Sequence, residues 1–288
     1  MSAKPPAIPP RPAARPRWAG RLALHAASLA VAFVFLLPLA WMLATSLRQP
    51  GLPPPRTVEW LPNPLTWSNY TRIFEIVPLG SDALNSLLVA TAAVIVTLVT
   101  ASMAGLGMAL ASPRWRGRWV ALAVGLLLVP VSAVWLPRFV LFTWLRLTNT
   151  YGALLAPALM GSSPLFVLLF FWSYRRVPAE VFESARLDGA GPLAIWRWVA
   201  LPLSLPTVVT VGVLTFWLYW GDFINPLLFL KSQSLYTLPI GVRQLQQLNR
   251  ANWPLLMAAA VVATAPATLV FLVVQRYLVG ASRPGRDD

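Results

Sequence analysis

The sequence predicts an all-α, polytopic membrane protein with about six transmembrane helices. Hydrophobic residues make up 57% of the 288 residues and charged residues only 11%, against roughly 45–50% and about 25% in soluble domains. Six apolar runs also reach about 20 residues, the length that a helix needs to cross the hydrocarbon core of a bilayer. Together these observations exclude a soluble globular domain.

The amino-terminal segment precedes the first apolar run. Residues 1–21 are rich in proline and basic side chains, a composition that predicts a disordered cytoplasmic tail. The run Leu22–Ser46 is longer than the apolar region of a signal peptide and long enough to span the membrane. We therefore expect a membrane domain over residues 22–280 and a short cytoplasmic tail over 281–288.

Five further runs predict the remaining spans: Leu84–Ala111, Trp119–Leu145, Tyr151–Trp172, Leu201–Trp220 and Leu255–Leu278. The third of the six spans contains Pro130 and Pro137. Proline removes a backbone donor and kinks or breaks a helix. Two interpretations stay open for this span: an ordinary kinked helix, or a broken helix that lines a transport pathway.

The basic residues predict the orientation. The net charge is +14, from 23 Lys and Arg against 9 Asp and Glu. These charges lie between apolar runs, where they sort membrane topology, so we expect no nucleic-acid partner. They are densest at Arg114, Arg116 and Arg118, on the same predicted side as both ends of the chain. Both termini are therefore expected in the cytoplasm.

Residues 175–202 form a charged stretch between the fourth and fifth predicted spans, with signals for two helices. A first helix is expected from Pro178 to Leu187, because proline suits the first turn of a helix. Gly189 fits a left-handed turn at its end, and a second short helix is expected from Pro192 to Val199. Acidic side chains on the first helix favour docking to a protein over contact with lipid. The sequence thus predicts a pair of cytoplasmic helices joined by a glycine elbow.

The spacing within this stretch carries a family resemblance. Glu183-Ser184-Ala185, three residues, Gly189, nine residues and Val199-Ala200-Leu201-Pro202 resemble the EAA loop of ABC importer permeases. The sequence around it is similar to the carbohydrate-uptake branch, of the maltose or glycerol-phosphate type, and to its second permease subunit. Weaker matches are collinear with that branch: Asn69-Tyr70, Asn85-Ser86, Leu147–Tyr151, Trp220–Pro226, Thr237–Pro239 and Gln275–Tyr277. One departure is Gly105-Leu106-Gly107-Met108, where such permeases usually carry Ala-Tyr-Ala.

The resemblance implies roles and partners. The residues implied to couple the chain to an ATPase are Glu183, Ser184, Ala185, Asp188 and Gly189. The implied partners are a second permease subunit, two ATP-binding subunits, an extracytoplasmic solute-binding protein, a sugar and membrane lipid. The implied location is the plasma (inner) membrane of a prokaryote.

The chain is expected to catalyse no bond chemistry and to hold no cofactor or metal. It has no cysteine and one histidine, His25, so thiolate and His-based sites lack their parts. Its two lysines, Lys4 and Lys231, stand outside any Gly-x-x-x-x-Gly-Lys-Ser/Thr phosphate loop. ATP is therefore expected to bind the partner subunits.

A substrate pathway is predicted late in the fifth span and just after it, at Trp217, Tyr219, Trp220, Asp222 and Asn225. Aromatic faces stack on sugars, and amides or carboxylates bond their hydroxyls. The same residues also suit an aromatic belt at the outer interface. Asp222 keeps an alternative open, a proton- or ion-coupled secondary transporter subunit, and an integral-membrane enzyme ranks last.

Overall fold

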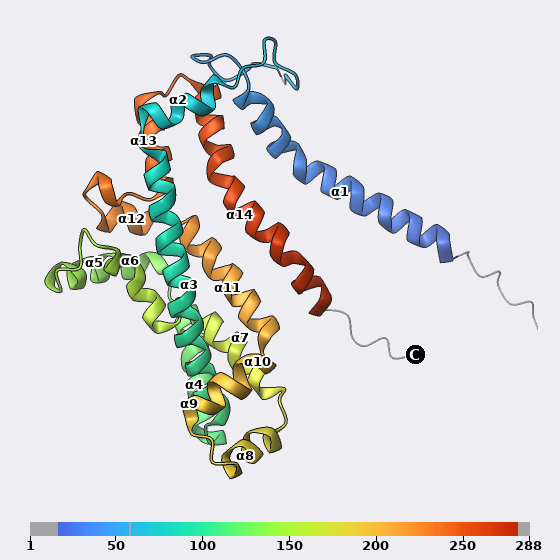
Figure 1. Ribbon diagram of the computed structural model, residues 1–288, viewed down its shortest axis with the longest axis vertical. Helices are drawn as coiled ribbons and strands as arrows, with labels where there is room; N and C mark the ends of the chain where they lie inside the picture. Colours follow the sequence, from blue (N-terminus) through green and yellow to red (C-terminus); the bar gives the residue numbers. More distant parts are fainter. Residues whose placement is uncertain (1–16, 58, 282–288) are drawn as a thin grey trace, which may run out of the picture.

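The computed structural model describes residues 17–57 and 59–281, and all regular structure within these ranges is helical (Figure 1). Residues 1–16 and 282–288 of the predicted tails lie outside the described residues. The first helix, α1, begins at Arg17, so the last residues assigned to the amino-terminal tail are helical.

The elements alternate between long helices and short connecting ones. The longest are α1 (Arg17–Ser46), α3 (Leu79–Leu110), α4 (Pro113–Leu127), α11 (Leu205–Trp220) and α14 (Trp253–Ala281). The shorter α-helices are α2 (Ser68–Ile76), α5 (Trp135–Trp144), α6 (Tyr151–Leu155), α7 (Pro164–Arg175), α8 (Ala179–Leu187), α9 (Pro192–Ala194), α10 (Leu201–Leu203), α12 (Ile224–Phe229) and α13 (Leu238–Leu248). The other helical turns are the 3-10 turns η1 (Val131–Val134), η2 (Ala156–Met160) and η4 (Gln233–Leu235), and the π-helix η3 (Ile195–Ala200).

The six predicted spans correspond to four continuous segments and two bent ones. The four are Gly20–Ser46, Leu79–Leu110, Tyr151–Arg175 and Trp253–Gln275. The third predicted span bends by 91° between Leu127 and Val131, and the fifth bends by 87° at Ser204. Four to six segments are therefore long and apolar enough to cross a membrane, which confirms the predicted fold class.

Local sequence explains where these helices begin. Pro113, Pro164 and Pro192 each occupy the first turn of a helix, where the missing N–H costs no hydrogen bond. The side chain of Ser163 caps α7 by accepting from the Leu165 N–H at 3.3 Å, as serine does at helix starts.

Helix α3 is the central element of the bundle and packs against both α7 and α11 (Figure 1). Its amino-terminal half shares one core with α12, α13 and α14, around Ala90, Phe229 and Leu255. Its carboxy-terminal half shares a second core with α7, α8 and η3, around Phe170 and Ile195. The second core therefore joins the 175–202 loop to the spans.

The elements that connect the spans gather at two opposite ends. Helices α8 and α9 lie at one end with the turn between α3 and α4, and α2 and α13 lie at the other (Figure 1). Helix α1 contacts α14 at the side of the bundle. Large apolar side chains along α1, such as Leu29 and Phe35, are exposed.

Candidate functional site

The 175–202 loop folds as two helices joined at a glycine elbow. Pro178 stands directly before α8, which ends at Leu187, and Gly189 has a φ of +85°. The Ala190 N–H donates to the Ala185 carbonyl at 2.9 Å, and the Gly189 N–H donates to the Arg186 carbonyl at 3.0 Å. These two bonds form a Schellman motif, which needs a left-handed residue at the glycine position. The predicted elbow is confirmed.

Most residues of the predicted coupling site face outward. Glu183, Ser184, Asp188 and Gly189 are exposed, and Ala185 is half-buried against the second core. Sequence reasoning missed Leu187, whose exposed fraction of 88% makes it the apolar tip of α8. The sequence pattern did not single out this leucine, because the periodicity of a helix does not show how far one side chain extends into solvent.

Charged residues surround a hollow beside α8. Its volume is about 530 Å³. Glu180 and Glu183 line it together with arginines of three segments: Arg116 of α4, Arg175 and Arg176 at the end of α7, and Arg186 of α8. The basic clusters that predicted one side of the membrane thus converge at one end of the fold.

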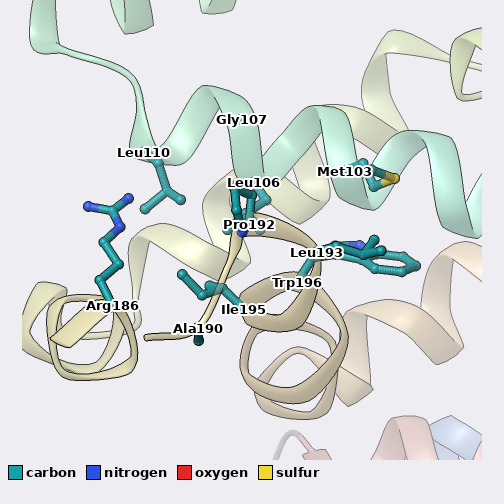
Figure 2. Close-up of a pocket in the computed structure, with 10 residues that line it drawn as sticks. All are labelled: Met103, Leu106, Gly107, Leu110, Arg186, Ala190, Pro192, Leu193, Ile195 and Trp196. Atoms are coloured by element: carbon teal, nitrogen blue, oxygen red, sulfur yellow. The ribbon is translucent and has the colours of Figure 1, made fainter. Parts of the chain in front are cut away.

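The second helix of the loop lies across the end of α3. An apolar hollow of about 570 Å³ lies between parts of the two, lined by Leu106 and Leu110 of α3 and by Leu193 and Trp196 of the loop (Figure 2). Arg186 stands at its rim (Figure 2). The helix continues through η3 to Leu203 and turns into α11 at Ser204.

The third predicted span is broken rather than kinked. The 91° bend lies between Leu127 and Val131 and contains Pro130, which lacks the N–H that would continue the helix. Beside the break lies a cavity of about 570 Å³, walled by α4, α5, the start of α7 and the α11–α12 turn. Of the two interpretations left open, the structure favours a broken helix next to a cavity.

Polar side chains from distant segments meet in this cavity. Arg138 of α5 donates to the Asn225 side-chain oxygen, and the Asn225 amide donates to Asp222 Oδ2 at 2.6 Å. The Tyr219 and Ser162 hydroxyls are 3.1 Å apart. All five residues line the cavity. Sequence reasoning missed Ser162, and it could not pair Arg138 with Asn225, because the two residues are 87 positions apart.

The predicted pathway residues separate into two groups. Tyr219, Asp222 and Asn225 line the cavity. The indoles of Trp217 and Trp220 instead donate to backbone carbonyls of α14, at Ala267 (3.3 Å) and Ala263 (2.9 Å). These two tryptophans pack α11 against α14, because they lie on a different face of the helix from Tyr219. Neither of them is among the residues that line the cavity.

The sequence profile of one protein family matches residues 101–283, and that family is described as the binding-protein-dependent transport system inner membrane component. The chain belongs to this family. It is therefore a multi-pass transport subunit of an inner membrane, and the resemblance carried by the 175–202 loop is confirmed.

Similar proteins extend the match to most of the transport subunit. The arabinooligosaccharides transport system permease protein AraQ of Halalkalibacterium halodurans is 30% identical and covers 88% of this chain and 92% of its own length. The sulfoquinovosyl glycerol transport system permease protein SmoH of Agrobacterium fabrum is 28% identical, covering 87% and 88%. A crystal structure of a bacterial ABC transporter involved in alginate import shares the fold, with a TM-score of 0.74, 19% identity, and 91% and 98% coverage.

Several of the collinear matches tie loops of the transport subunit to its helices. The Asn69 amide donates to the Ser46 and Arg48 carbonyls at 2.9 and 2.7 Å. The Asn85 amide donates to two carbonyls of the 234–236 segment, each at 2.9 Å. Asn149 Oδ1 accepts from the Lys231 and Ser232 N–H groups at 2.9 and 2.8 Å. These asparagines therefore hold the loops at the end of the bundle opposite α8.

Proposed function

We propose that this chain is the second permease subunit of an ABC importer for a sugar or a related solute. The observation that carries the proposal is the 175–202 loop: two helices, spaced as in EAA loops, meet at Gly189 on an exposed end of the bundle. The names of AraQ and SmoH, which denote transport of sugar-containing solutes, support the substrate class.

Helix α8 is the docking element for an ATP-binding subunit. Its exposed face offers Glu183, Asp188 and the apolar tip Leu187 to a groove on that subunit. Arginines of this chain line the hollow beside Glu183, so positive charge already surrounds this carboxylate. The docking contact therefore does not depend on a single ion pair between Glu183 and the partner. ATP-driven closure of the partner moves α8, and the loop transmits the movement to the spans.

The cavity beside Pro130 is this subunit's half of the translocation pathway. Arg138, Asp222 and Asn225 place donors and acceptors for hydroxyl groups on one wall, and Tyr219 adds an aromatic face. A second permease subunit completes the pathway, an extracytoplasmic binding protein delivers the solute, and two ATPase subunits supply energy. Both termini and α8 lie on the cytoplasmic side.

The complex, purified with its partner subunits and reconstituted in vesicles, tests the proposal. Uptake of a panel of labelled mono- and oligosaccharides is expected to require ATP on the α8 side and the binding protein on the other. Collapse of the proton gradient is expected to leave uptake intact. Uptake that needs the gradient and ignores ATP would instead establish a secondary transporter.

An Asn225→Ala variant in the same vesicles tests the pathway residues. Loss of the bonds from Arg138 and to Asp222 is expected to lower uptake about tenfold, because hydrogen bonds to charged groups are among the stronger ones. Unchanged uptake and sugar preference would remove this cluster from the pathway.

A further inference from the structure

One polar bond fastens the second helix of the loop to the central helix of the bundle. Trp196 Nε1 donates to Ser102 Oγ at 2.9 Å. Ser102 is fully buried on α3, and its hydroxyl donates to the Leu98 carbonyl of the same helix. Its proton is therefore engaged within α3, which leaves a lone pair for the indole.

The side of α3 that carries Ser102 is held rigidly. One turn further on, a Cβ added to Gly105 would lie 2.7 Å from Phe170 Cβ and 2.9 Å from the Phe171 backbone nitrogen of α7. The backbone of α3 at Gly105 therefore packs directly against the backbone and a side chain of α7. The indole of Trp196 is therefore bonded to a helix, α3, that packs closely against α7.

The chain changes direction at both ends of the helix that carries Trp196. The Gly189 elbow precedes its amino terminus, and the 87° bend at Ser204 follows its carboxy terminus. Trp196 also lies in the π-helix η3, and its carbonyl accepts from the Leu201 N–H. π-Turns occur often at functional sites and rotate the residues on their two sides relative to one another. The Trp196 side chain lies beside the α3 turn of Met103 (Figure 2).

We propose that the Trp196–Ser102 hydrogen bond makes the movement of α8 switch the pathway. With the bond in place, a movement of α8 displaces α3, α7 and α11 together. Without it, only the apolar packing of the second core holds this helix to α3 and α7, and ATP hydrolysis is partly uncoupled from movement of the spans. Trp196 and Ser102 are positioning residues, and their role rests on the proposed function.

A single-cysteine reporter measures this coupling, since the native chain has no cysteine. Val131 lines the cavity and is 66% exposed. A Val131→Cys chain is assembled with its partner subunits, and its labelling by an impermeant maleimide is timed with and without ATP, magnesium and vanadate. In the otherwise native complex, ATP and vanadate are expected to change the labelling rate.

Trp196→Phe and Ser102→Ala are each expected to shrink that ATP-driven change about fivefold, the order of one hydrogen bond, while ATP hydrolysis and subunit co-purification persist. The double variant is expected to be no worse than either single one, because both remove the same bond. Trp172→Phe is the matched control: it trims an exposed indole of α7 and is expected to keep the native response.

Three outcomes would overturn the proposal: a full response in Trp196→Phe, additive losses in the double variant, or failure of Ser102→Ala to assemble, which would assign the bond to folding. A complex that hydrolyses ATP yet never changes labelling at position 131, even with native Trp196, would contradict the proposed function itself. The two failures are therefore distinguishable.

Discussion

Gly189 and Gly191 show at the residue scale what the elbow requires. Neither has an atom within 4 Å of the position that a Cβ would take. They differ in backbone conformation, since φ is +85° at Gly189 and −71° at Gly191. Left-handed φ is costly for residues with a Cβ, and ordinary φ is not. Conformation alone, and not space, therefore sets the need for glycine at position 189.

Gly189→Ala is expected to weaken association with the ATPase subunit by about 1 kcal/mol, because the left-handed elbow becomes strained. Gly191→Ala, at an equally open position, is expected to leave association unchanged. Co-purification and binding titration of the ATPase subunit against the assembled permease measure both. Equal behaviour of the two variants, or full association and transport in Gly189→Val, would show that the elbow is not needed for docking.

The contact between α3 and α7 explains, at the element scale, why this chain departs from Ala-Tyr-Ala at Gly105-Leu106-Gly107-Met108. Gly105 is buried and faces the α7 backbone, with the Val167 carbonyl oxygen 3.0 Å from the position that an alanine Cβ would take. Gly107 faces outward with open space around it. Only the first glycine permits the close approach of the two helices.

Gly105→Ala is expected to destabilise the subunit by about 1–3 kcal/mol, since the added methyl meets backbone that must move. Gly107→Ala on the same helix is expected to be neutral or slightly stabilising, because alanine favours a helix over glycine. Thermal unfolding of the purified complex in detergent compares them. A Gly105→Ala melting temperature equal to the native one would contradict the close contact.

At the scale of the whole molecule, the loop 47–67 and helix α8 lie at opposite ends of the bundle (Figure 1). Leu61 in the first is 85% exposed and Leu187 in the second is 88% exposed. Basic residues of three segments gather near α8. The positive-inside rule therefore predicts that this is the cytoplasmic end.

Single cysteines at these two sites report the orientation in cells. An impermeant maleimide is expected to label Leu61→Cys in intact spheroplasts and Leu187→Cys only in inside-out vesicles. The cysteine-free parent is the control for labelling of other proteins. Labelling of Leu187→Cys from outside would reverse the topology and remove α8 from reach of a cytoplasmic ATPase.

Features that depend on neighbouring residues could be predicted from the amino-acid sequence. Apolar run length predicted the spans, Pro192 a helix start, and Gly189 a left-handed elbow, because each reflects local backbone preference or transfer to lipid. The spacing from Glu183 to Pro202 was enough to indicate the family. The same local evidence could not choose between a kink and a break at Pro130.

Which side chains meet depends on how the helices pack in three dimensions. Tyr219 and Trp220 are adjacent in sequence, yet Tyr219 lines the cavity and Trp220 donates a hydrogen bond to α14. The two side chains point to different faces of α11, and the packing of α11 decides which face meets the cavity. Arg138 reaches Asn225, and Trp196 reaches Ser102, across 87 and 94 positions. Spans that are apolar on all sides carry little periodicity to reveal such pairings, so helix packing alone fixes them.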